Sequence, residues 1–111
     1  MSRIVRLILM YDFNMKEENE LKEYNKFHRY IQSLGFIMMQ YSVYYRVANT
    51  NSKADSFVKL VEKKLPSNGH VRILKITDRE FLDMKILRGN RKINESINSN
   101  ERFIKINHDE N

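Results

Sequence analysis

The sequence predicts an α+β domain with the element order βαββαβ. Three observations support this prediction. The chain opens on a nearly unbroken apolar run, and two later stretches show helical periodicity. The aromatic-rich segment between those helices is about twice the length of an average strand, so it predicts two strands or one bent strand. With 111 residues and 41% hydrophobic content, the chain suits one compact domain.

The opening apolar run, residues 3–12, predicts the central strand of the sheet. Because it lacks a clean polar alternation after Arg6, we expect this strand to be covered on both faces and hydrogen-bonded on both edges. The run ends on Asp12, at the carboxyl end of a strand, where ligand and metal sites of α/β proteins gather. Asp12 is therefore the first candidate site residue. The alternative is that Asp12 only forms the turn into the next helix.

The first helix is expected to start at Asn14, which has Glu17 at the spacing of a reciprocal capping partner. It should end near residue 33, before Gly35. Apolar residues three or four positions apart predict its buried face: Leu21, Tyr24, Phe27, Ile31 and Leu34. The extended segment 36–47 should break near residues 40–42. Four tyrosines are read as packing groups rather than base-stacking platforms: Tyr30, Tyr41, Tyr44 and Tyr45.

A second helix is predicted from a capping signature at Ser52 and Asp55, and it should end at Pro66. Its inward positions are expected to be Phe57, Val58, Val61 and Leu65. Residues 67–69 predict a turn and residues 70–76 a strand. Thr77 and Glu80 then cap a short helical turn that carries Phe81, Leu82 and Met84, and residues 85–88 predict one more brief strand.

Basic residues predict a surface for a polyanion, since the net charge is +6 and is spread over the domain. Spacing places Lys22, Lys26 and Arg29 on one face of the first helix. Outward positions of the second helix are expected to be Lys53, Lys59, Lys63 and Lys64. Our candidates for nucleic-acid contact are Lys22, Lys26, Arg29, Lys59 and Lys63. The alternative is a solvated face, on which Glu18 pairs with Lys22.

The C-terminal part predicts association between subunits. We divide the chain into a domain at 1–89, a polar linker at 90–100 and a last strand with an acidic tail at 101–111. A strand that follows a linker must find a sheet edge for its backbone groups. We therefore expect it to pair onto the partner in a homodimer. The partner-binding residues are expected to be Arg102, Phe103, Ile104 and Ile106.

Several classes of function are excluded by composition. The chain has no Cys, which excludes disulfide scaffolds, thiolate zinc sites and cysteine nucleophiles. No apolar run reaches the length of a membrane span, and the first strand carries two arginines, so we expect a cytoplasmic protein with no membrane partner. His28, His70 and His108 lack the spacing of metal ligands and are read as structural or surface residues.

The element order is that of a ferredoxin-like α+β sandwich, with the last strand as an addition. An RNA recognition motif shares this order, but its aromatic consensus is missing here. Three stretches resemble the small CRISPR-associated adaptation protein, the second Cas family: 11–14 (Tyr-Asp-Phe-Asn), 40–44 (Gln-Tyr-Ser-Val-Tyr) and the basic strand followed by a C-terminal strand. The segments 35–38, 76–78 and 101–102 are most similar to members from type II-A systems.

This resemblance implies a homodimer that joins the CRISPR integrase subunit and holds double-stranded protospacer DNA during spacer acquisition. It also implies that Asp12 matches the aspartate assigned as the Mg²⁺ ligand of a described nuclease activity. Two hypotheses therefore stand: a DNA-binding structural subunit, and a Mg²⁺-dependent endonuclease that cleaves RNA or DNA through paired Asp12 carboxylates. A toxin-like ribonuclease of the VapD type shares the strand-Asp opening and is disfavoured by the C-terminal half.

Overall fold

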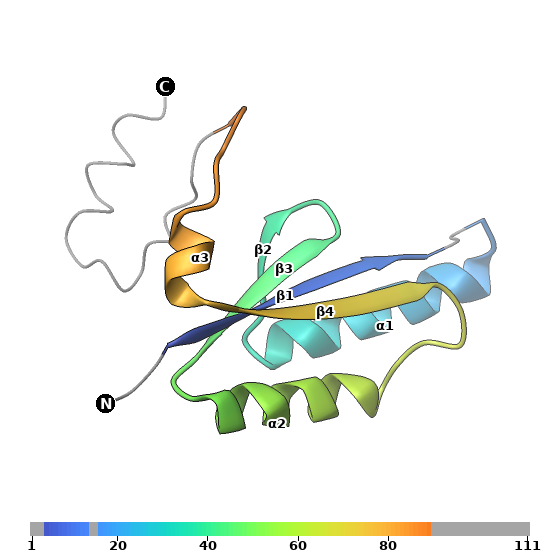
Figure 1. Ribbon diagram of the computed structural model, residues 1–111. Helices are drawn as coiled ribbons and strands as arrows, with labels where there is room; N and C mark the ends of the chain where they lie inside the picture. Colours follow the sequence, from blue (N-terminus) through green and yellow to red (C-terminus); the bar gives the residue numbers. More distant parts are fainter. Residues whose placement is uncertain (1–3, 14–15, 90–111) are drawn as a thin grey trace.

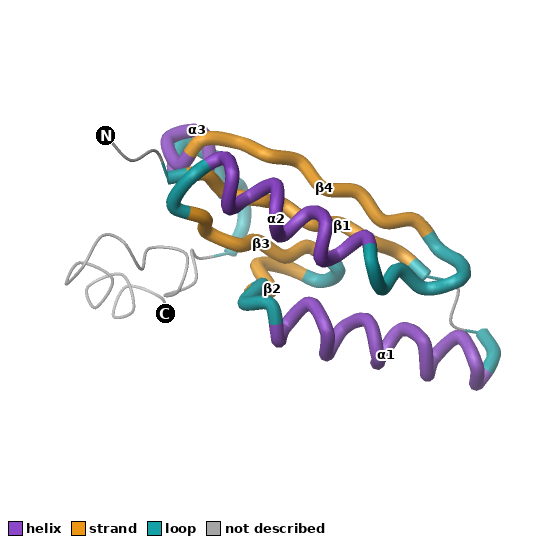
Figure 2. Tube along the Cα trace, turned by 90° about the horizontal axis from the view of Figure 1, so that it is seen from below, coloured by secondary structure: helices purple, strands orange, loops and turns teal. Residues whose placement is uncertain are grey.

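The computed structural model describes residues 4–13 and 16–89, and within them the predicted order of elements is present (Figure 1). One antiparallel sheet has the strand order β2-β3-β1-β4. Its strands are β1 (Val5–Asp12), β2 (Ile37–Gln40), β3 (Val43–Ala48) and β4 (His70–Thr77). Helices α1 (Glu18–Ser33) and α2 (Asn51–Glu62) lie on one face of the sheet (Figure 2). The predicted ferredoxin-like α+β fold is confirmed.

A short helix, α3 (Asp78–Leu82), follows β4 and lies on the opposite face of the sheet from α1 and α2 (Figure 1). Thr77 and Glu80 cap it reciprocally, as predicted: Glu80 N–H donates to Thr77 Oγ1 at 3.0 Å, and Thr77 N–H donates to the Glu80 carboxylate at 2.9 Å. The brief strand predicted at 85–88 is wrong, because these residues pair with no strand in the described part. The predicted linker and last strand lie outside the described residues.

β1 is the central strand, as predicted, with β3 on one edge and β4 on the other. Leu7 and Leu9 face the helices and are 0% exposed, and Ile8 on the opposite face packs under α3. Met10 and Asp12 share that opposite face and are exposed, because α3 covers only the end of the sheet where β1 begins. The prediction that β1 is covered on both faces is therefore correct for its first half and wrong at its carboxyl end.

A buried arginine joins α3 to the sheet. Arg6 is 1% exposed, and its Nε donates to Asp78 Oδ1 at 2.9 Å. Its guanidinium carbon lies 4.1 Å from the centroid of the Phe81 ring and 5.4 Å from that of Tyr45, and both rings are fully buried. Ion pairing and stacking together compensate the removal of this charge from water. We call Arg6, Asp78, Phe81 and Tyr45 the Arg6 clamp.

The start of α1 differs from the prediction and its end agrees with it. Glu17 is the N-cap, and its backbone N–H donates to the Glu20 carboxylate at 3.2 Å, so the capping pair lies three residues later than expected. Residues 14–20 contain two pairs at this spacing, Asn14 with Glu17 and Glu17 with Glu20, which explains the error. Gly35 ends the helix with a φ of +94°. Leu21 was predicted to lie on the buried face of the helix, but it lies in the first turn and is 46% exposed.

The start and the end of α2 both differ from the prediction. Thr50 is the N-cap and its side chain accepts from the Lys53 N–H at 3.0 Å, so Ser52 is already helical. The helix ends at Glu62, one turn before Pro66. Leu65 therefore lies beyond the helix and is 48% exposed, although its spacing predicted an inward position.

The aromatic segment forms a hairpin, β2 and β3, with a break at Tyr41 and Ser42 as predicted. Ser42 has a φ of +64°, the left-handed conformation that tight hairpin turns need. Tyr44 and Tyr45 are fully buried and confirm the packing interpretation. The same interpretation is wrong for Tyr41, which is 72% exposed on the turn.

Candidate functional site

The predicted basic residues of α1 form one exposed row. Lys22, Lys26 and Arg29 are exposed, and their spacing of four and three residues places them on one face of the helix. None of the three forms an ion pair with another described residue, so the predicted pair between Glu18 and Lys22 is not formed. We call Lys22, Lys26 and Arg29 the basic stripe.

The lysines of α2 are exposed as predicted, but Lys59 and Lys63 do not share a pocket with the basic stripe. The residue that does is Lys64, whose Nζ lies 5.2 Å from the centroid of the Tyr30 ring on α1. Helical spacing predicted that Lys64 points outward with the other lysines. Because α2 ends early, Lys64 instead turns toward α1. The sequence signal of this early end is Pro66, two residues after Lys64.

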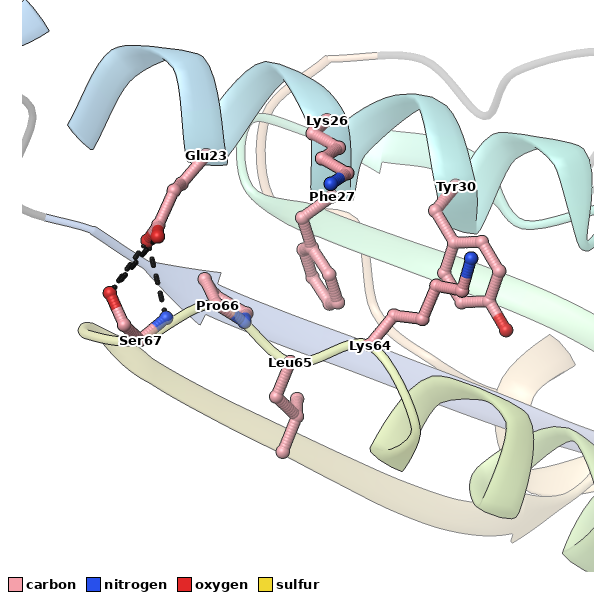
Figure 3. A pocket seen from close by; sticks show the side chains of 8 residues that line it. All are labelled: Glu23, Lys26, Phe27, Tyr30, Lys64, Leu65, Pro66 and Ser67. Carbon is pink, nitrogen blue, oxygen red and sulfur yellow. Dashed lines mark hydrogen bonds between the residues drawn. The ribbon is translucent and has the colours of Figure 1, made fainter. Parts of the chain in front are cut away.

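A cavity of about 400 Å³ lies between α1 and the segment that follows α2. Figure 3 shows Lys26 and Tyr30 on the α1 side of the cavity and Lys64 extending toward Tyr30 from the other side, while the Leu65 side chain points away from α1. We call it the helix-face pocket. Its lining residues are Glu23, Lys26, Phe27, Tyr30, Lys64, Leu65, Pro66 and Ser67.

Asp12 lies at the carboxyl end of β1 on the uncovered face of the sheet. It is exposed, and no ion pair or hydrogen bond joins its carboxylate to another residue in the described part of the chain. His70 is its neighbour in the register with β4, and Met10 pairs with Arg72. A shallow cavity of about 470 Å³ opens here, lined by Met10, Tyr11, Asp12, Ser42, Val43, His70 and Arg72.

The turn before β4 fixes the backbone at Asp12. Gly69 has a φ of +88°, and a Cβ at this position would lie 2.6 Å from the Asp12 carbonyl oxygen. Two carboxylates of α1 hold the same turn: Glu23 accepts from Ser67 Oγ at 2.8 Å, and Glu20 accepts from Asn68 Nδ2 at 3.2 Å. The sequence predicted this turn but not that it packs on the candidate site residue.

Beneath Asp12, on the helix side of the sheet, two tyrosines share one histidine. His28 Nδ1 lies 2.7 Å from the Tyr44 hydroxyl and 3.2 Å from the Tyr11 hydroxyl. Burial raises the pKa of Tyr11 far above its ordinary value, and the adjacent Tyr44 raises it further; burial also raises the pKa of Tyr44. His28 is therefore part of the packed structure, as predicted. His70 is a surface residue, as predicted, and His108 lies outside the described residues.

One chain offers little to a metal ion by itself. Within residues 4–13 and 16–89, no three His, Cys, Asp or Glu side chains are grouped as a metal site. Mg²⁺ commonly binds one or two protein carboxylates and keeps several waters. The exposed Asp12 carboxylate can supply one such ligand. No described helix has the length and apolar character needed to cross a membrane.

Comparison with known proteins adds to this geometry. A family model described as CRISPR associated protein Cas2 matches residues 5–84. The protein named CRISPR-associated endoribonuclease Cas2 from Ligilactobacillus salivarius is 42% identical over 100 residues, which are 90% of this chain and 98% of that relative. The protein of the same name from Campylobacter jejuni is 38% identical, over 87% of this chain and 68% of that relative.

A solved structure described as the crystal structure of cas2 also resembles the fold. It has a TM-score of 0.55 and 17% sequence identity, and the match covers 80% of this chain and 91% of the other. At this identity the likeness concerns the fold alone.

Proposed function

Because the chain belongs to the CRISPR-associated protein Cas2 family, we propose that it acts in CRISPR adaptation as a homodimer that binds duplex protospacer DNA and bridges integrase dimers. The observation that carries the DNA-binding part is the basic stripe, three exposed cations on one helix face with no ion pair in the described part. Such a row neutralises phosphates without reading bases. The net charge of +6 favours the same partner.

The uncovered face of the sheet supports the homodimer. Met10 and Leu74 are 36% and 52% exposed on this face; Met10 lies two residues before Asp12, and Leu74 pairs with Ile8. β4 is an outer strand, bonded to β1 alone among the described strands, so it has a free edge for a strand from a partner. The segment that would use such an edge is 101–106, with Arg102, Phe103, Ile104 and Ile106 as its side chains.

Reversing the charge of the basic stripe tests DNA binding. We expect Lys22→Glu combined with Lys26→Glu to lower duplex affinity about tenfold or more, because phosphate contacts dominate such affinity. The slope of log affinity against log salt should become about two units shallower, at about 0.9 per contact. Fluorescence anisotropy with labelled duplex measures both. Lys53→Glu, an exposed change outside the basic stripe, is the control. Equal losses in both variants would contradict the proposal.

A second candidate function, a Mg²⁺-dependent phosphodiesterase, is favoured by the Asp12 carboxylate, which lies in a shallow cavity and has no bonded partner among the described residues. Mg²⁺, when bound, would polarise the scissile phosphate and help to activate water. The paired Asp12 carboxylates of a homodimer would hold the ion. Arg72 lines the same cavity and brings a positive charge for a phosphate.

Asp12→Asn separates the two functions, because it removes the charge and keeps the size. The nuclease hypothesis predicts loss of RNA or DNA cleavage, while spacer acquisition in a reconstituted system stays near the wild-type level if the chain acts as a scaffold. The variant should fold normally, since Asp12 is exposed. A variant that is dimeric and DNA-bound but fails in acquisition would show that metal chemistry is central and the scaffold hypothesis wrong.

A further inference from the structure

The helix-face pocket differs from the basic stripe because it combines charge with an apolar wall. Leu65 is 48% exposed at its edge, and Phe27 at its base is almost fully buried. The Tyr30 ring is fixed in place, since its hydroxyl donates to the Leu60 carbonyl at 2.8 Å. A volume of about 400 Å³ lies in the range of small-molecule sites.

The charges of the pocket favour an anion. Its carboxylate, Glu23, accepts from both the N–H and the hydroxyl of Ser67, at 3.2 and 2.8 Å, and so is directed toward the chain itself (Figure 3). Lys26 and Lys64 remain, and neither forms an ion pair in the described part of the chain. Lys64 lies over the Tyr30 ring, a contact worth only about 0.5–1 kcal/mol at an exposed site, so a phosphate can draw it away.

We propose that the helix-face pocket binds one unpaired nucleotide, with its base against Tyr30 and its phosphate between Lys26 and Lys64. This inference rests on the proposed DNA binding, because Lys26 belongs to both the basic stripe and the pocket. A strand that follows the stripe therefore reaches the pocket with its phosphates already in place. An acidic peptide also complements the charge of the two lysines, but no described feature aligns a peptide with the basic stripe.

The test compares a blunt DNA duplex with a duplex that carries one unpaired nucleotide at its end. We expect the wild-type chain to bind the second duplex about fivefold more tightly, since stacking of a base on an aromatic ring is worth roughly 1–3 kcal/mol. Lys64→Ala should abolish this ratio. Lys53→Ala is the control: it removes an exposed lysine that neither lines the pocket nor belongs to the predicted nucleic-acid contacts, so it should keep the ratio.

A 2-aminopurine base in the unpaired position gives a second readout, since stacking quenches its fluorescence. Quenching in the wild-type chain and in Lys53→Ala, but not in Lys64→Ala, would support the pocket. Binding of both duplexes with a ratio of one would overturn this inference and leave the proposed DNA binding intact. Failure to bind either duplex would overturn both. If an acidic peptide displaces both duplexes and the 2-aminopurine fluorescence is never quenched, the pocket belongs to a protein partner instead.

Discussion

The two faces of the sheet differ in how completely they are covered. On the helix side, β1 contributes Leu7, Leu9 and Tyr11 to a core closed by α1 and α2. On the other side, the Arg6 clamp covers only the first half of the strand, and Met10 and Asp12 are exposed beyond it. One strand thus buries all of its side chains on the helix side, and on the other side it exposes only Met10 and Asp12.

Truncation of neighbouring residues on opposite faces gives the largest contrast. Leu9→Ala should lower the free energy of unfolding by about 3 kcal/mol, because the side chain is 0% exposed and leaves a cavity. Met10→Ala should cost about 1 kcal/mol or less, since this side chain is 36% exposed. Urea unfolding followed by circular dichroism measures both. Similar losses would mean that the uncovered face is as packed as the core, and would refute the contrast.

Substitution of two glycines that share a backbone conformation separates the cost of a side-chain clash from the cost of the backbone conformation. Gly69 and Gly89 have φ values of +88° and +94°, so an alanine at either costs roughly 1–2 kcal/mol. At Gly69 the new Cβ also meets the Asp12 carbonyl oxygen, while at Gly89 no atom of the described residues lies within 4 Å of it. We therefore expect Gly69→Ala to be the more destabilising and to shift the Asp12 amide signal in NMR spectra. Equal effects would argue against this contact.

The buried tyrosines predict a smaller, pH-dependent effect. The fold raises the pKa of Tyr11 above its ordinary value of 10.0, so the folded chain keeps a proton that the unfolded chain releases. Stability from this group is complete below pH 10 and falls as the pH rises further, by at most about 1.4 kcal/mol per pH unit. Tyr11→Phe should make unfolding less sensitive to alkaline pH. The exposed Tyr41→Phe should not, and an equal effect there would contradict the assignment.

The fold followed from the sequence because hydrophobic patterning and turn residues act locally. The apolar run ending at Asp12, the break before Val43 and the glycine-ended turns placed the main elements. Helix ends were less predictable, since several polar residues compete as caps. The helix-face pocket depends on one such end. The apolar periodicity predicted that α2 ends at Pro66, but the helix ends at Glu62, and the segment after it turns Lys64 toward Tyr30.

The neighbours of Asp12 were hidden for a different reason. His70 and Arg72 are far from Asp12 in the chain, and their place on the same face is set by the register between β1 and β4. Alternation shows which residues share a face of one strand, but it does not give the offset between two strands. Asp12 itself was therefore predictable from the sequence, and the residues around it were not.

The Arg6 clamp has a practical consequence for handling the protein. Salt weakens contacts between exposed lysines and phosphates, but it screens a buried ion pair much less. Arg6 is 1% exposed, so salt should screen its ion pair with Asp78 only weakly. If the proposed DNA binding holds, a wash at high ionic strength should release nucleic acid from the basic stripe while α3 stays packed on the sheet, so that no refolding is needed.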